Sequence, residues 1–433
     1  MAPRNRLAAS MVACLLIASC CPFGLLAEDS RLLRDGDRVV LLGGTFIERM
    51  QTHGYLEMEL TSVLRTRNLT FRNLGWSGDN VRGESRAVFG SIEDGYARLL
   101  RDLKLASPSV VLIHYGIVEA RAGPAGLEGF RQGLKQLVDD IQRLDARVVL
   151  LLPRPQVAMP FPFPAADAFN ESLDPYRSAI VDLAKLTGSA MVDLDAPGTT
   201  RLPSGSRGGR EGRTKGGRTP FQQGLSVDGV QLTAEGYWEQ AAALAAALGG
   251  NRDRAELKID IQAGRVDAAG VTAEWDTLGD DHVVITYQRS VLTRFVSPRE
   301  GDTQLQHAAG LSAWVKGMPP GKYHVTISPG GWGPVLLSSR QLAAGVTFPG
   351  VDEGQLESLR KTIAQKNEYF FHRYRPQNET YLFLFRKHEQ GNNAVEIPMF
   401  DPLVESLDRE IRRLSVPPIR TLRLQRRPTQ ESK

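Results

Sequence analysis

The chain has 433 residues, of which 42% are apolar, 24% charged and 7% aromatic. This length predicts two or three globular units and excludes a small disulfide-stapled scaffold, and the composition excludes a disordered chain and a multi-span membrane protein. The net charge is only +4, but the positive charge is concentrated in two segments. Residues 201–220 contain six Lys or Arg and one acidic residue, and the last 25 residues contain eight Lys or Arg and two acidic residues. The basic character therefore belongs to appendages of an acidic body.

Residues 1–27 predict an export signal, because two arginines precede an apolar stretch that closes at Ala27. Pro22 and Gly24 interrupt the apolar run, which disfavours a membrane span of about 20 residues. Cleavage after Ala27 would give a periplasmic or extracellular protein. Alternatively, Ile17 to Cys20 resembles a lipobox, in which Cys20 would carry a lipid anchor. All three cysteines lie in this leader, so the body must fold without disulfides.

Five short runs rich in Val, Ile or Leu predict buried strands. They are Arg38–Leu42, Leu69–Leu74, Ser109–His114, Arg147–Leu152 and Ala190–Leu194. Amphipathic segments predict helices at Ile47–Leu64, Ile92–Leu105, Leu127–Leu144, Ala168–Leu186 and Ala234–Leu248. This alternation predicts a three-layer α/β/α domain over residues 31–250, with a parallel five-stranded sheet. Ligands of such sheets lie at the carboxyl ends of the strands.

The rest of the chain predicts three further regions. Residues 201–220 are rich in Gly, Arg and Ser and predict a flexible basic loop within the α/β domain. Alternating apolar residues predict a small antiparallel β domain over residues 251–350. Residues 351–433 predict a C-terminal section with helical segments, an aromatic block and a basic tail.

The aromatic block, Tyr369 to Phe385, holds seven of the chain's 31 aromatic residues, interleaved with Arg, His, Asn and Glu. Such a mixture can line a site for a sugar or an anionic polymer, because aromatic rings stack on ligands and Arg pairs with carboxylate or sulfate. We favour the alternative interpretation, a strand that pairs with the β domain, since most aromatic clusters are core.

Four short blocks lie directly after predicted strands or before the last predicted helix of the α/β domain. They are Gly43-Gly44-Thr45, Asn73 to Asp79, Tyr115 to Glu119 and Asp228 to Thr233. In this order and at these positions they resemble the blocks of the SGNH (GDSL-type) hydrolase family. Asp228 to Trp238, DGVQLTAEGYW, is especially similar to the family's final block, in which a DxxH motif leads into a helix. The resemblance covers residues 37–250.

The resemblance implies an acyl or acetyl esterase whose nucleophile is a serine at the end of the first strand, activated by an Asp-His pair in the last block. The oxyanion hole would come from the N–H of the nucleophile, a glycine N–H in the second block and an asparagine side chain in the third. Such chemistry needs a base that accepts the proton of the hydroxyl, and preorganised donors for the tetrahedral oxyanion.

At the matching positions this chain has Thr45, Gly78, Val118, Asp228 and Gln231, of which only Gly78 and Asp228 fit the family pattern. Glutamine cannot take a proton, and loss of the base costs about 10⁶ in turnover in a well-studied serine hydrolase. Valine supplies no oxyanion donor, and the loss of one such donor lowers kcat by about 10² to 10³. Two hypotheses follow: an exported esterase with a degenerate site and Thr45 as a weak nucleophile, or a catalytically silent member that binds a glycan or an acyl ligand.

His114 and Glu119 are further candidates for the cleft, since His114 ends the third strand and Glu119 follows Val118. For both we favour a structural role: a packed histidine with satisfied hydrogen bonds and a salt-bridged loop acid. No pair of histidines has metal-ligand spacing, so the sequence predicts no zinc site and no cofactor. The predicted ligand is a small acylated compound or carbohydrate. For the basic loop and tail, export favours an anionic envelope polymer or lipid headgroups over nucleic acid as the partner, and we favour a simply solvated loop over either.

Overall fold

The computed structural model describes residues 32–195, 225–252, 254–279, 281–294, 309–350 and 352–428. The predicted export signal with Cys20 and the predicted basic loop at residues 201–220 lie outside these described residues. Among the helices within them, none has both the length and the apolar character that crossing a membrane requires.

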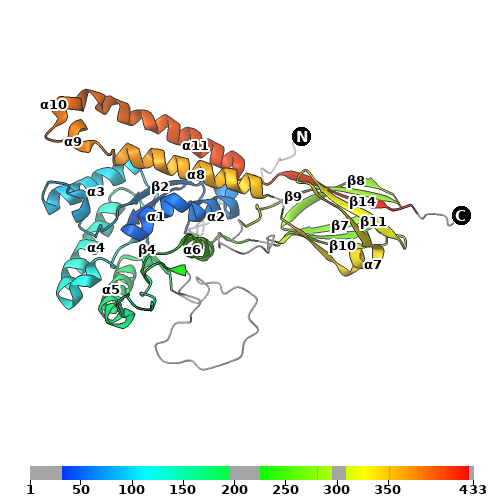
Figure 1. The fold of residues 1–433 in the computed structure, drawn as a ribbon, viewed down its shortest axis with the longest axis horizontal. Coiled ribbons are helices and arrows are strands. Elements are labelled where there is room, and N and C mark those ends of the chain that lie inside the picture. The colour runs from blue at the N-terminus through cyan, green and yellow to red at the C-terminus, as the bar shows by residue number, and fades with distance from the viewer. Residues whose placement is uncertain are drawn as a thin grey trace, which may run out of the picture. The chain divides into compact units, whose positions relative to one another are not determined.

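A parallel five-stranded sheet forms the middle layer of the α/β domain (Figure 1). Its order is β2-β1-β3-β4-β5, and every neighbouring pair is parallel. All five residues of β3 are buried, as expected for a strand that is covered on both faces. The strands are β1 (Arg38–Gly43), β2 (Thr70–Gly75), β3 (Val110–His114), β4 (Arg147–Leu152) and β5 (Ala190–Asp193).

Helices cover both faces of this sheet, which confirms the predicted three-layer α/β/α class. Along β1, Val40 and Leu42 pack with apolar residues of α3, α4 and α5, whereas Val39 and Leu41 pack with those of α1, α2 and α6. The helices are α1 (Thr45–His53), α2 (Tyr55–Val63), α3 (Ile92–Ala106), α4 (Leu127–Gln142), α5 (Ala166–Thr187) and α6 (Ala234–Ala247). Short 3₁₀ helices lie at Arg65–Arg67, Glu84–Arg86 and Glu119–Gly126.

The predicted helix Ile47–Leu64 is two helices, α1 and α2, which meet at Gly54. Gly54 has φ of 67°, a left-handed conformation that ends α1, and its N–H donates to the carbonyl oxygen of Met50. A Cβ at Gly54 would lie 3.0 Å from Cγ2 of Ile363, so the absence of a side chain also lets a C-terminal helix pack closely at this turn.

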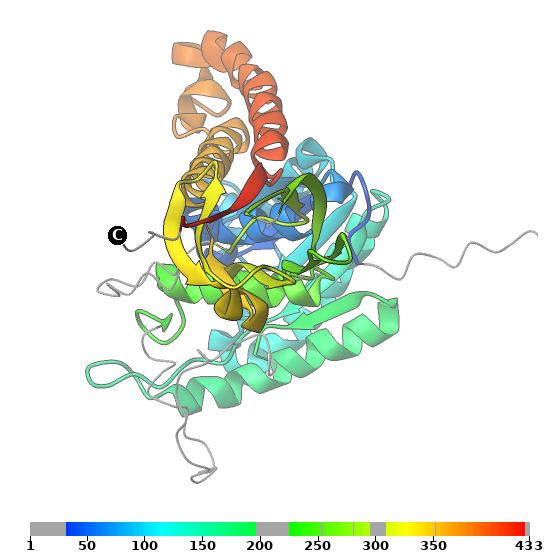
Figure 2. The same cartoon turned by 90° about the vertical axis from the view of Figure 1, so that its right-hand side faces the viewer.

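The β domain consists of two sheets with a shared apolar core (Figure 2). Their orders are β13-β10-β6-β7 and β12-β11-β14-β9-β8, and all pairs are antiparallel except β6 with β10. The strands are β6 (Glu256–Asp260), β7 (Arg265–Ala269), β8 (Val271–Leu278), β9 (His282–Arg289), β10 (Ala309–Lys316), β11 (Lys322–Ser328), β12 (Trp332–Ser338), β13 (Val346–Pro349) and β14 (Ile419–Arg426). Helix α7 (Ser339–Ala344) follows β12.

Strand β14 comes from the predicted basic tail and lies between β9 and β11. Its Leu422 and Leu424 enter the core of the β domain, and Arg423 is exposed between them. The chain therefore returns to the β domain after the C-terminal helices, and much of the tail is a strand rather than an appendage.

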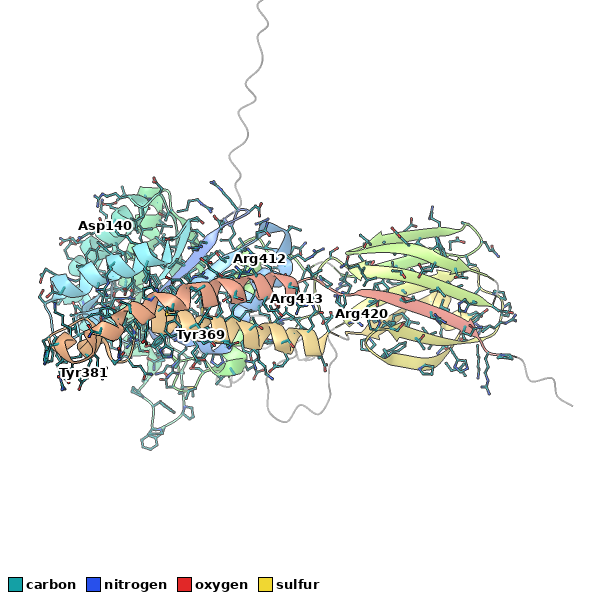
Figure 3. All side chains as sticks on the ribbon, turned by 90° about the horizontal axis from the view of Figure 1, so that it is seen from above. Asp140, Tyr369, Tyr381, Arg412, Arg413 and Arg420 are labelled. Carbon is teal, nitrogen blue, oxygen red and sulfur yellow. The ribbon has the colours of Figure 1, made fainter. Side chains whose placement is uncertain are left out.

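The two long C-terminal helices, α8 (Glu353–Tyr374) and α11 (Phe400–Leu414), lie side by side, as Figure 3 shows from above. They are joined by α9 (Glu379–Leu382), α10 (Lys387–Gln390) and a 3₁₀ helix at Gly391–Met399. We call α8 to α11 the C-terminal hairpin. Arg420, at the start of β14, pairs with Asp352 just before α8 at 2.8 Å, so the hairpin begins and ends at the same place.

The favoured interpretation of the aromatic block as a strand is wrong, because its first part completes α8 and α9 follows. Phe370 and Tyr374 are four residues apart and both are buried against the α/β domain, and they continue the helical spacing of Leu359 and Ile363. The alternative, a site for a sugar or an anionic polymer, stays a prediction.

Candidate functional site

A cavity of about 290 Å³ lies at the carboxyl ends of the strands and brings the four sequence blocks together. All seven predicted site residues line it: Thr45, Gly78, His114, Val118, Glu119, Asp228 and Gln231. Residues this far apart in sequence meet because parallel strands end at the same edge of the sheet.

Thr45 is the first residue of α1, and only Gly44 separates it from Gly43, the last residue of β1. A Cβ at Gly43 would lie 2.5 Å from the carbonyl oxygen of His114, so glycine is required for α1 to begin this close to β3. The N–H of Gly78 donates a long hydrogen bond, 3.4 Å, to the hydroxyl oxygen of Thr45. The predicted nucleophile and the predicted oxyanion donor are therefore neighbours.

Asp228 makes its observed hydrogen bonds with the backbone. Its Oδ1 accepts from the N–H of Val230 at 2.9 Å and from that of Gln231 at 2.7 Å, which closes a tight turn. Gly229 within this turn has φ of 88°. The side chain of Gln231 stands where the family resemblance places a histidine, and an amide has no titratable nitrogen with which to accept a proton from Thr45.

His114 is buried at the end of β3, with its ring centroid 4.6 Å from that of Phe46. Burial lowers the pKa of His114 to about 4, and a hydrogen bond to its own backbone opposes the shift only in part. The imidazole is therefore neutral at pH 7 and a weak base. This environment agrees with the packed role that the sequence favoured.

Glu119 bridges two loops of the site. Its carboxylate accepts from the N–H of Gly116 at 2.8 Å and from the N–H of Val81 at 3.0 Å. Burial raises the pKa of Glu119, and these backbone hydrogen bonds oppose the rise. The partners are thus backbone N–H groups, whereas the sequence predicted a salt bridge. Val118, beside it, contributes an apolar wall and no donor.

Sequence reasoning missed several residues of the cavity wall, because it singled out only the positions that match the family's functional residues and the residues beside them. Arg154 follows the end of β4 and donates from Nη1 to Gln240 at 3.1 Å. Tyr237 donates to the carbonyl oxygen of Phe46 at 3.0 Å, which ties α6 to α1. The position of Arg154 just beyond a predicted strand was a usable signal; that of Tyr237, within a helix, was not.

A buried ionic group holds Asp79, the last residue of the second block. Oδ2 of Asp79 accepts from Nε of Arg86 at 2.7 Å and from the hydroxyl of Tyr115 at 3.0 Å. Burial opposes the charge on Arg86, but the neighbouring acidic groups prevail and raise its pKa. Within the described residues, no group of three or more His, Cys, Asp or Glu side chains is placed to hold a metal ion.

Comparison with known proteins gives a family match and fold matches. The model of the GDSL-like Lipase/Acylhydrolase family matches residues 50–239, a range that includes Gly78, Val118, Asp228 and Gln231 and begins after Thr45. No curated protein matches the chain.

Several solved structures resemble this one. A gut microbial diltiazem-metabolizing enzyme, BT4096, is 14% identical with a TM-score of 0.63, over 91% of this chain and 98% of that one. Axe2, an acetylxylan esterase from Geobacillus stearothermophilus, is 18% identical with a TM-score of 0.37, over 51% of this chain and 97% of that one. LAE5, an alpha/beta hydrolase enzyme from the metagenome of Lake Arreo, Spain, is 18% identical with a TM-score of 0.37, over 51% and 98%. At 14% identity, the likeness to BT4096 shows the fold alone, and it extends beyond the α/β domain.

Proposed function

Residues 50–239 of this chain belong to the GDSL-like lipase/acylhydrolase family, and on that premise we propose that the protein is an ester hydrolase with a degenerate catalytic site. Its ligand is a small acylated compound, and Thr45 supports slow hydrolysis. The observation that carries this proposal is the hydrogen bond between the Thr45 hydroxyl oxygen and the Gly78 N–H in the wall of the cavity.

The cavity suits the acyl part of a small ester. Its volume of about 290 Å³ is at the lower end for ligand sites. Phe46, Ile117, Val118 and Val157 contribute apolar walls on which methyl or methylene groups can pack.

In the proposed reaction, Oγ1 of Thr45 attacks the ester carbonyl, and the Gly78 N–H donates to the oxygen that becomes negative. The acyl group is then bound to Thr45, the alcohol leaves with the proton, and water hydrolyses the acyl ester. Gln231 cannot take the proton, which costs about 10⁶ in turnover where it has been measured. We therefore expect slow turnover.

The test is hydrolysis of p-nitrophenyl acetate by the parent, Thr45→Ala and Gln231→His. The parent should exceed Thr45→Ala, and Gln231→His should exceed the parent at least about tenfold, since a general base contributes about 10² or more. Equal rates for the parent and Thr45→Ala would contradict hydrolysis by Thr45.

A second candidate function is a catalytically silent module that binds an acyl or glycan ligand. Two observations favour this second function. Asp228 accepts its hydrogen bonds from backbone N–H groups, and Gln231 stands where a base would be needed. N-acetylglucosamine is a suitable probe, because its amide resists hydrolysis. Calorimetry should detect binding of this sugar to the parent and none to Val118→Arg, because the arginine side chain fills the cavity. That result would support the second function, provided that Thr45→Ala hydrolyses p-nitrophenyl acetate as fast as the parent does.

Export to the periplasm or the extracellular space is proposed from the leader alone. Sequencing the N-terminus of the mature protein distinguishes the possibilities. A start at Glu28 indicates simple cleavage, a lipid-modified Cys20 indicates an anchored lipoprotein, and an intact Met1 in the cytoplasmic fraction contradicts export. Binding of an anionic envelope polymer by the basic segments also stays a prediction.

A further inference from the structure

The C-terminal hairpin is fixed to the α/β domain by buried ion pairs. Lys366 of α8 pairs with Glu57 of α2 at 2.7 Å, and Asp408 of α11 pairs with Arg72 of β2, also at 2.7 Å. The side chains of all four are at most 7% exposed. Such pairs hold their elements in register, because a shift would leave a charge buried without its partner.

The carboxyl end of α8 reaches the loop after β2, which carries Gly78. The hydroxyl of Tyr374 donates to the carbonyl oxygen of Gly75 at 3.0 Å. The guanidinium carbon of Arg375 lies 3.5 Å from the ring centroid of Trp76, a cation–π contact. The backbone N–H of Trp76 in turn donates to the carbonyl oxygen of Gly43 at 2.9 Å, so the main chain at Trp76 joins the first two blocks of the site.

Arg375 also acts on the loop through Glu48 of α1. Its Nη1 donates to Oε1 of Glu48 at 3.1 Å. The other oxygen, Oε2, accepts from the backbone N–H of Ser77 at 2.6 Å and from the Ser77 hydroxyl. Each carboxylate oxygen thus has its own partner, and the Glu48 side chain is only 17% exposed. Removing the guanidinium would free the carboxylate to rotate away from Ser77.

Ser77 directly precedes Gly78, whose N–H faces the Thr45 hydroxyl. We propose that Arg375 is a positioning residue of the candidate site. Through Glu48 and Trp76 it holds Ser77, and with it the Gly78 N–H, at the place where the oxyanion of the reaction would form. The inference rests on the proposed function of this cavity, and it makes the C-terminal hairpin part of the catalytic apparatus without any contact with the ligand.

The kinetic test uses the Gln231→His background, in which we expect faster hydrolysis. Arg375→Ala should lower kcat about 10- to 100-fold and leave KM within about twofold, because misplacement of a donor by about 1 Å costs that much. Arg375→Lys should recover part of the loss, since an ammonium can still pair with Glu48. The matched control is Arg373→Ala, in the last turn of α8 and two residues before Arg375, whose partner is Asp401 of α11 at 2.8 Å.

Equal kcat for Arg375→Ala and Arg373→Ala would overturn the positioning role, and so would a loss confined to KM. If Gln231→His hydrolyses no faster than Thr45→Ala, the proposed function fails, and a second measurement decides on Arg375. Hydrogen–deuterium exchange of the peptide that spans residues 74–80 should be about tenfold faster in Arg375→Ala than in the parent, with Arg373→Ala unchanged. Unchanged exchange of this peptide in Arg375→Ala would refute the proposal that Arg375 holds the loop that carries Gly78.

Discussion

Lys366, within α8, donates from its ammonium to both carboxylate oxygens of Glu57, each at 2.7 Å. It also donates to the carbonyl oxygen of Phe71 in β2 at 3.0 Å. Burial lowers the pKa of Lys366 and raises that of Glu57, and each partner opposes the shift of the other. A helix some 300 residues later in the chain thus completes the polar interior of the α/β domain.

Replacing Lys366 by Met should destabilise the protein by about 3 to 5 kcal/mol, because it leaves the buried carboxylate of Glu57 unpaired. Adding Glu57→Leu should recover most of that loss, since an apolar pair has no charge to desolvate. Urea unfolding measures both variants. The control is Lys361→Met, whose pair with Glu357 is largely exposed and should contribute under about 1 kcal/mol. A loss in Lys366→Met no larger than in this control would contradict the prediction.

The sequence predicted the α/β domain well because its signals are local. Each strand of the parallel sheet is a continuous apolar run, and three of the four blocks directly follow a strand, so their meeting at one edge of the sheet could be expected from order and spacing. His114 was identified in this way, whereas Gly78 was identified from the family resemblance.

The C-terminal section was predicted less well because its partners are distant in sequence. Nothing near Lys366 indicates Glu57, and nothing near Leu422 indicates that this segment would pair with β9 and β11. Arg375 was noted only as one of several cations in an aromatic block. Its contacts with Glu48 and Trp76 depend on how the hairpin packs, which no local pattern encodes.

Gly75→Ala should be strongly destabilising. A Cβ at this position would lie 2.1 Å from the backbone nitrogen of Glu48, so α1 would have to move away from β2. We expect a loss of about 3 kcal/mol in the free energy of unfolding, at the upper end for overpacking. Gly44→Ala is the matched control: its nearest contact would be 3.4 Å, and we expect a change within about 1 kcal/mol. Similar losses in the two variants would show that the close approach of α1 is not what requires glycine.

The burial of His114 predicts a specific pH dependence of stability. Its pKa is about 4 in the folded protein, against an ordinary 6.5, so the unfolded chain binds more protons between these values. The stabilisation is complete above pH 6.5 and is lost as the pH falls towards 4. From pH 7 to pH 4.5, the parent should lose about 2 to 3 kcal/mol more than His114→Gln, because carboxylate titrations are common to both. Parallel stability–pH curves would place the imidazole in a hydrated site.

The variant Asp228→Asn distinguishes the role of Asp228 in the turn from the catalytic role that the family resemblance implies for it. The amide oxygen of asparagine can still accept from the N–H groups of Val230 and Gln231, so the free energy of unfolding should stay within about 0.5 kcal/mol of the parent. Asp228→Ala removes the acceptor and should lose about 1 to 2 kcal/mol.

In the Gln231→His background, Asp228→Asn has a different consequence. The new imidazole needs a carboxylate to orient it and to stabilise its cation, and the corresponding Asp→Asn change in a serine protease lowers kcat by about 10⁴. The gain in p-nitrophenyl acetate hydrolysis from Gln231→His should therefore disappear in the double variant while its melting temperature is kept. A double variant that keeps the gain would mean that the new histidine works without Asp228, and that this carboxylate serves the turn alone.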